Sequence, residues 1–252
     1  MKKIALAALL CILLLPVCGQ AYEEAVVVSD LMLWTQQYLG SPGGSIYVPF
    51  ELTNTSDTTL EITRCEVAVP DITGEILLRE DVLSFYPKIL KPGQKAYGLY
   101  ERKVWGLDAA RYAAPLFTLI TRTTDRNAFV LPMAFEGNEV DACCGVIRAC
   151  FMAMNRTRQH LNDGIGVAAF FDKGGQLLDV VIQPYADNLF PYDPINLYDF
   201  ESKDALILRL WSLNYAVFDR VLERGVRWTT GFICSAEADM EYYGNAFDRD
   251  DW

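Results

Sequence analysis

The sequence has 252 residues, of which 52% are hydrophobic and 22% are charged, a balance that excludes a disordered chain and predicts a globular one. Its 33 acidic and 22 basic residues give a net charge of −11 at pH 7. So acidic a surface would repel phosphate backbones, and no nucleic-acid partner is expected. The single histidine, His160, excludes metal sites built from several histidines and leaves little room for histidine-centred catalysis.

The first 21 residues have the three parts of a secretory signal peptide. Met1-Lys2-Lys3 is basic, Ile4–Val17 is an almost unbroken apolar run, and Gly19-Gln20-Ala21 provides the small residues that a signal peptidase prefers. As a helix the apolar run covers about 21 Å, less than the ~30 Å hydrocarbon core of a membrane. We therefore expect residues 1–21 to be removed, the mature chain to begin at Tyr22, and the protein to be secreted from a bacterial cell.

A lipoprotein is the alternative for this segment, because Cys18 follows the apolar run. Lipid attachment normally needs a small residue just before the cysteine, and Val17 stands there instead. No second stretch of 18 apolar residues follows, so no membrane span is expected in the mature chain.

Alternating residues in the first part of the mature chain predict β-strands. Val48, Phe50 and Leu52 occupy every second position, which is the period of a half-buried strand. The segment after them, Asn54-Thr55-Ser56-Asp57, consists of polar residues that favour turns.

In the next predicted strand, the apolar residues switch from even-numbered to odd-numbered positions part-way along. Leu60 and Ile62 share one parity, whereas Cys65, Val67 and Val69 share the other. A β-bulge between these two groups would bring all five side chains to one face. Cys65 is accordingly expected to be buried.

Two further segments read as turns, Asp71-Ile72-Thr73-Gly74 and Leu90-Lys91-Pro92-Gly93-Gln94. Short strands separated by turns at intervals of roughly 8–12 residues indicate a β-sandwich.

The chain contains an internal similarity at a constant offset of 101 residues, between residues 45–80 and 146–181. The matches include a turn asparagine, an Asp-x-x-Gly turn and alternating apolar positions, and the offset is about one domain length. We therefore predict two copies of one β-domain. The identical pairs are Ile46 and Ile147, Phe50 and Phe151, Asn54 and Asn155, Leu60 and Leu161, Ala68 and Ala169, Asp71 and Asp172, Gly74 and Gly175, and Leu77 and Leu178.

The order of these motifs resembles a known family. Phe50-x-x-x-Asn54, then Asp71-x-x-Gly74, then Leu90-Lys91-Pro92-Gly93 is similar to the small immunoglobulin-like β-sandwiches of secreted bacterial proteins, the F-x-L-Y-D type in particular. Phe170-Phe171-Asp172 fits the hairpin motif of that family, whereas Val69-Pro70-Asp71 departs from it. The resemblance implies an extracellular accessory or adhesion-type module and implies no catalytic residues.

The predicted organisation is all-β, with two tandem immunoglobulin-like β-sandwich domains after the cleaved signal peptide. The signal peptide spans residues 1–21, the first domain 22–125 and the second domain 126–234. Residues 235–252 form an acidic tail, with six acidic residues and Arg249 as the one basic residue. Near the C-terminus, residues 206–224 fit either a strand that ends near Leu213 or a helix, and both alternatives stay open.

An odd number of cysteines remains after the signal peptide, so at least one thiol is unpaired within a monomer. Their spacing lacks the C-x2-C pairs of structural zinc sites. We interpret them as small buried side chains, with the disulfide pairing undetermined, and expect neither a metal nor a cofactor. The five are Cys65, Cys143, Cys144, Cys150 and Cys234.

Aromatic residues are the candidate binding residues in this sequence. Tyr185, Phe190, Tyr192 and Tyr198 gather in a short proline-containing stretch. If exposed, they would stack on sugar rings or hold a peptide; if buried, which we favour, they would cover the second sandwich.

No motif of a nucleotide-binding or catalytic site occurs in the chain. The predicted function is a secreted, non-catalytic binding or structural module whose partner is an extracellular protein or a glycan. The alternative is a secreted, glycosidase-like hydrolase that uses paired carboxylates, although 33 acidic residues would offer such pairs in any fold.

Overall fold

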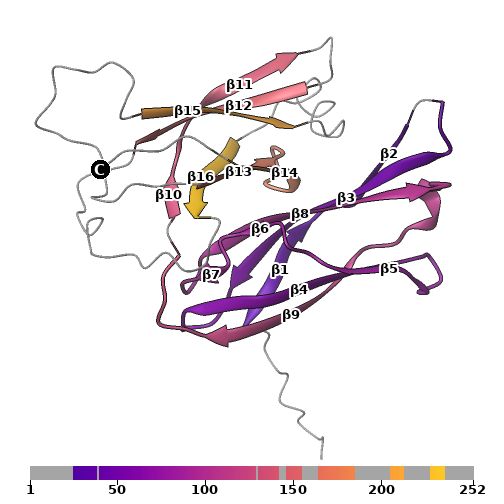
Figure 1. Cartoon of the computed structure of the whole chain (residues 1–252), viewed down its shortest axis with the longest axis horizontal. Coiled ribbons are helices and arrows are strands. Elements are labelled where there is room, and N and C mark those ends of the chain that lie inside the picture. The colour runs from indigo at the N-terminus through magenta and orange to yellow at the C-terminus, as the bar shows by residue number, and fades with distance from the viewer. Residues whose placement is uncertain are drawn as a thin grey trace, which may run out of the picture.

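A computed structural model describes residues 25–38, 40–128, 130–141, 146–154, 164–184, 205–212 and 228–235, and this part of the chain is nearly all β (Figure 1). All strand pairs are antiparallel, and Ala109–Arg111 forms a 3-10 turn. The all-β prediction is confirmed. The strands of the N-terminal half are β1 (Val26–Leu31), β2 (Trp34–Gln37), β3 (Gly43–Asn54), β4 (Leu60–Pro70), β5 (Ile76–Asp81), β6 (Phe85–Tyr86), β7 (Ile89–Leu90), β8 (Lys95–Trp105) and β9 (Leu116–Thr123), and those of the C-terminal half are β10 (Val130–Pro132), β11 (Ala134–Asp141), β12 (Val146–Met154), β13 (Gly164–Phe171), β14 (Leu177–Pro184), β15 (Ala205–Ser212) and β16 (Trp228–Ser235).

The N-terminal half is a sandwich of two sheets. One sheet has the order β1-β3-β8-β6, with β2 also paired to β3, and the other contains β5, β4, β7 and β9. Alternate residues of β3 and β4 face each other between the sheets, and the phenyl ring of Phe50 lies 4.8 Å from that of Phe117. The predicted bulge is present, because the register of β4 on β9 shifts between Ile62 and Arg64. Cys65 is buried, as expected.

The predicted turn Asn54-Thr55-Ser56-Asp57 needs a correction at its first residue, Asn54. It is the last residue of β3, it is fully buried, and the turn begins after it. Its amide nitrogen donates to the carbonyl oxygens of Thr58 and Leu90, at 2.8 and 2.9 Å, and its side-chain oxygen accepts from Ser56. The side chain therefore ties two turns to the core rather than only biasing local dihedrals.

The C-terminal half is built from the sheet β11-β12-β15 and the sheet β10-β16-β13-β14. β12 and the β13–β14 hairpin fall where the offset of 101 places the counterparts of β3 and the β4–β5 hairpin. Phe50 and Phe151 are both fully buried, as the alignment predicted.

The β4–β5 and β13–β14 hairpins agree residue by residue at this offset. In the first, Gly74 N–H donates to the Asp71 carbonyl at 3.0 Å and Glu75 N–H donates to the Asp71 carboxylate at 3.0 Å. In the second, Gly175 donates to the Asp172 carbonyl and Gln176 to the Asp172 carboxylate, also at 3.0 Å each. Both glycines have positive φ, 91° and 85°, a conformation in which a side chain is strained. The predicted Asp-x-x-Gly turns are therefore both present.

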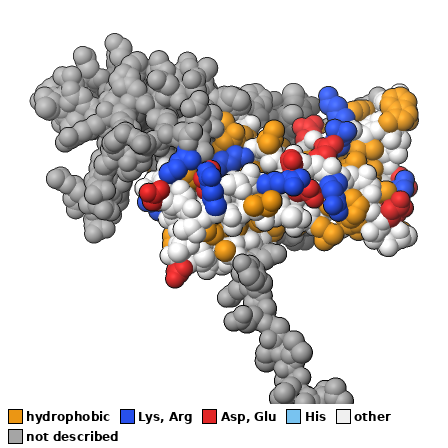
Figure 2. All heavy atoms as spheres, turned by 60° about the horizontal axis from the view of Figure 1, so that its bottom comes forward, with side chains coloured by type: hydrophobic (Ala, Val, Ile, Leu, Met, Phe, Trp, Pro, Cys, Tyr) orange, Lys and Arg blue, Asp and Glu red, His pale blue; other side chains and the backbone are white. Residues whose placement is uncertain are grey.

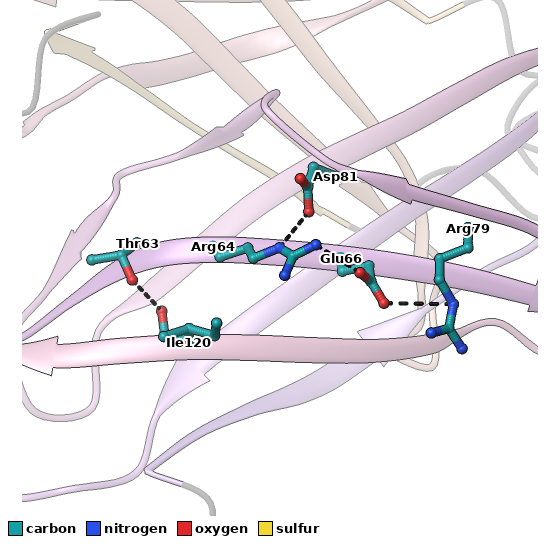
Figure 3. Close-up of polar contacts among 6 residues, drawn as sticks. All are labelled: Thr63, Arg64, Glu66, Arg79, Asp81 and Ile120. Atoms are coloured by element: carbon teal, nitrogen blue, oxygen red, sulfur yellow. Dashed lines mark hydrogen bonds and ion pairs between the residues drawn. The ribbon is translucent and has the colours of Figure 1, made fainter.

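The outer face of the two hairpins differs between the halves, and this difference explains how the halves pack. On β4 and β5 it carries an ion-pair ladder in which Arg64 bonds Asp81 at 2.7 Å and Glu66 at 2.9 Å, and Arg79 lies 3.7 Å from Glu66 (Figure 3). At the offset of 101 the residues that correspond to this ladder are apolar: Ile165, Val167, Val180 and Ile182.

Those apolar residues are buried or half-buried in a cluster shared with the N-terminal half. Tyr97 of β8 enters this cluster, with its ring 6.1 Å from that of Phe171. Asp30 of β1 accepts a hydrogen bond of 2.6 Å from the backbone N–H of Leu177. The C-terminal half thus sits on the outer face of β3 and β8. The equivalent positions on β4 and β5 are polar, and the outer face of that hairpin is open.

Several sequence predictions fall on residues outside the described part of the chain. These are the signal peptide over 1–21, the lipoprotein alternative at Cys18, and the tail after Ser235. Residues 206–212 belong to strand β15, which answers the strand-or-helix question there, and residues 213–224 lie outside the described ranges. Within those ranges, no helix is long and apolar enough to cross a membrane.

Candidate functional site

The aromatic residues that the sequence singled out cannot be placed. Tyr185, Phe190, Tyr192 and Tyr198 all lie outside the described residues. Their role as ligand-binding residues stays a prediction, and the described part of the chain presents a different group of aromatic residues.

That group lies on the outer face of the sheet at the end of β2, β3 and β8 that extends beyond the C-terminal half (Figure 1). Along β8 the side chains on this face become progressively more open. Tyr97 is 6% exposed and lies under the C-terminal half, Glu101 and Lys103 are exposed, and Trp105 is 81% exposed. The open part begins where the contact between the halves ends.

The strand register brings the residues of this face into rows. Trp34, Tyr47 and Glu101 form one row across β2, β3 and β8, and Gln36, Ser45 and Lys103 form the next. Ile46 and Val48 of β3 are buried in the core. Because alternate residues of a strand point to opposite faces, the residues of both rows stand on the face away from the core. We call Trp34, Gln36, Tyr38, Ser45, Tyr47, Glu101 and Trp105 the aromatic platform.

A stacked pair of rings forms the centre of the aromatic platform. The Trp34 and Tyr47 rings are nearly parallel, with centroids 4.2 Å apart and an interplanar angle of 11°. The Tyr47 hydroxyl donates to the Gln36 side-chain oxygen at 3.4 Å, and the hydroxyls of Tyr38 and Ser45 are 2.5 Å apart. These contacts hold the two rings and their polar neighbours in one arrangement.

The electrostatics of the platform keep Tyr47 protonated. Partial burial raises the pKa of its phenol, the hydrogen bond with Ser45 lowers it, and the negative charge of Glu101 raises it. The phenol therefore remains a neutral hydrogen-bond donor over the physiological range. Next to it, the Trp34 indole N–H is buried and has no acceptor among the described residues, an arrangement that costs stability unless another group satisfies it.

The platform can bind but offers little chemistry. Its flat apolar rings can stack on the C–H face of a sugar ring, while hydroxyl, amide and carboxylate groups beside them can bond sugar hydroxyls. It contains no histidine or cysteine, and the described residues include no group of three or more His, Cys, Asp or Glu that would hold a metal ion.

Three of the described carboxylates are held by basic side chains. Glu51, which is buried, is held by Lys95 at 2.8 Å and by the Ser29 hydroxyl at 2.6 Å. Glu61 is held by Arg122 at 2.7 Å, and Glu80 lies 3.1 Å from Arg102. Each of these acids is already engaged by a cation, which suits structural roles rather than proton transfer.

The cysteines whose side chains are described are free thiols, Cys65 and Cys150. Burial raises the pKa of Cys65 to about 12, so its thiol stays protonated and unreactive in the folded protein. This agrees with the prediction that Cys65 serves as a small buried side chain.

Comparisons with known proteins identify no family. No protein-family model and no curated protein sequence matches the chain. Among solved structures, red sea bream transglutaminase shares 11% sequence identity over 73% of this chain and 27% of its own chain, with a TM-score of 0.20. A similarity so low carries no argument about this chain, so the site must be interpreted from its own residues.

The aromatic platform has no local signature in the sequence, for a physical reason. Trp34, Tyr47 and Glu101 come from three strands and are far apart in the sequence, so no local motif connects them. The available signal was the parity of Tyr47, which alternates with the buried Ile46 and Val48 and therefore had to face outward.

Proposed function

We propose that this protein is an exported, non-catalytic module that binds carbohydrate through the aromatic platform. The observation that carries the proposal is the stacked Trp34–Tyr47 pair, set among hydrogen-bonding side chains, with the exposed Trp105 further along the same face of the sheet. A half-buried pair of stacked rings with polar groups at its edge fits a ligand that has both an apolar face and many hydroxyls.

The tandem organisation belongs to the same proposal. Equivalent hairpins at a constant offset of 101 residues support two immunoglobulin-like domains, in keeping with the resemblance to the F-x-L-Y-D type. The shared apolar cluster around Tyr97 joins them. The C-terminal domain then acts as a fixed neighbour of the platform rather than as a separate module on a flexible linker.

Binding of sugars is expected to depend on the exposed indole of Trp105. Trp105→Ala should weaken binding of oligosaccharides prepared from bacterial cell walls or mucin by about tenfold, which corresponds to ~1.4 kcal/mol of lost stacking. Titration calorimetry of the folded variants measures this change. Tyr47→Phe, which keeps the ring and removes only the hydroxyl, should weaken binding less.

The matched control is Leu83→Ala, because Leu83 is also highly exposed, at 78%, and lies outside the platform. It should bind like the wild type. The proposal is wrong if the wild type binds none of these oligosaccharides, or if Trp105→Ala and Leu83→Ala weaken binding equally.

Export is expected to remove residues 1–21 when the full chain is expressed in a bacterium. The basic start, apolar run and small-residue exit support this expectation. The intact mass of the protein recovered outside the cytoplasm should correspond to an N-terminus at Tyr22. A mass that includes Met1, or a lipid on Cys18, would contradict it.

A further inference from the structure

Within the described part of the chain, strand β9 has one unpaired edge. Its partner among the described residues is β4, on one side, over all eight of its residues. On its outer face Leu116 is 57% exposed and Ile120 is 49% exposed, and on its inner face Phe117 and Leu119 are only half-buried. An unpaired strand edge presents a row of N–H and C=O groups that can pair with another strand.

In the C-terminal half, the edge equivalent to that of β9 is covered by an antiparallel strand. β16 pairs with β13 as β9 pairs with β4, and its other side is covered by β10, where Leu131 lies opposite Ile233. Leu31 pairs with Phe50 as Phe135 pairs with Phe151, so by strand pairing the counterpart of β10 in the N-terminal half is Val26–Val28, and this segment pairs with β3 instead. The fold therefore has a place for one more antiparallel strand next to β9, which this segment leaves open.

The sequence of β9 lacks the features that usually protect an edge. The strand Leu-Phe-Thr-Leu-Ile-Thr-Arg-Thr contains no proline, glycine or lysine. Its one charged residue, Arg122, is neutralised by Glu61, with nitrogen and oxygen atoms 2.7 Å apart. β-branched and aromatic residues make up most of the strand, and these favour pairing.

The outer face beside β9 is also nearly neutral, in contrast to the chain as a whole, whose net charge is −11. Figure 2 shows basic and acidic side chains next to each other on this side of the molecule, with apolar groups between them. A second copy would therefore meet little repulsion at the face itself, because four arginines stand against three acids in its ion pairs. The residues of its ion pairs are Arg64, Arg79, Arg122, Arg126, Glu61, Glu66 and Asp81.

We propose that the occupant of the β9 edge is β9 of a second copy of this chain. Antiparallel pairing about a two-fold axis at Leu119 or Ile120 keeps the outer faces of both copies on one side. Arg122 then faces Leu116 or Thr118 of the other copy and never meets its own counterpart. The pairing joins the two β5–β4–β9 layers into one continuous sheet.

The test is the oligomeric state of the mature chain, measured by light scattering after size-exclusion chromatography over a range of concentrations. The wild type is expected to dimerise, and Ile120→Lys to raise the dimer dissociation constant at least tenfold, because the substitution brings two lysines close to the two-fold axis. Leu83→Lys is the matched control, since it places the same charge at another exposed apolar position, and it should dimerise like the wild type. Thr118→Lys, also on the exposed face, serves if Ile120→Lys does not fold.

Hydrogen exchange of the wild type locates the contact. The amides of β9 should become more protected as the protein concentration rises. Protection that is independent of concentration in a monomer would mean that another part of the same chain covers the edge, and the proposal would be overturned. A wild type that stays monomeric, assembly that continues beyond the dimer, or equal effects of Ile120→Lys and Leu83→Lys would overturn it as well.

Discussion

Replacing Phe50 by alanine is expected to lower the free energy of unfolding by about 3–5 kcal/mol. The ring is fully buried and packs 4.8 Å from Phe117 and 6.5 Å from Phe85, measured between ring centroids. It also lies directly over Gly98, where a Cβ would come within 2.2 Å of the ring. Because Gly98 has no side chain, nothing on that side can fill the cavity, and the lost contacts are not recovered.

Replacing Phe151, the counterpart of Phe50, by alanine tests whether the stability of the C-terminal half depends on the corresponding buried ring. Phe151 is fully buried, and its ring occupies the space above Gly231. Phe151→Ala should therefore cost a similar amount in denaturant unfolding followed by circular dichroism. The control is Phe135→Ala, because Phe135 lies opposite Phe151 on the neighbouring strand but is 38% exposed. Equal costs for Phe135→Ala and Phe151→Ala would contradict the placement of the core.

Replacing Val167 by glutamate is expected to destabilise the protein by about 3–5 kcal/mol or to separate the two halves. Val167 is fully buried in the cluster that contains Tyr97 and Phe232. A carboxylate there would lose its hydration, and the apolar cluster offers it no cation. Burial and the nearby charge of Glu51 already raise the pKa of Tyr97, so a further negative charge at this interface is unfavourable. Denaturant unfolding measures the cost, and small-angle scattering detects separation.

The reciprocal substitution, Glu66→Val, is the matched control for this prediction. Glu66 occupies the position that corresponds to Val167 at the offset of 101 residues, but it lies on the open ion-pair ladder of Figure 3. Because its partner Arg64 is about half exposed, removing the pair should change stability by less than about 1 kcal/mol. If both exchanges cost the same, the two faces do not differ in burial as described.

Features that depend on neighbouring residues could be predicted from the sequence. Alternation placed Val48, Phe50 and Leu52 inside, and the parity change after Ile62 predicted the bulge in β4. The Asp71 and Asp172 turns were readable because a carboxylate bonds backbone N–H groups two and four residues further on, and glycine adopts the positive φ that follows. Hydrophobic alternation and turn chemistry are local, so one strand or hairpin is enough to reveal them.

Which faces of the sheets are covered could not be predicted from the sequence and became visible in the folded structure. Ile165 and Arg64 occupy equivalent positions, and one lies in the contact between the halves while the other is open. The contact from Asp30 to Leu177 spans 147 residues, and the rows of the aromatic platform come from three strands. Such contacts depend on how the sheets stack and on which strand pairs with the edge of a sheet. β10 pairs with β16 at one such edge, whereas the described residues leave the edge of β9 open. The free energy that selects them is the burial of apolar surface between segments distant in sequence, and no local pattern contains it.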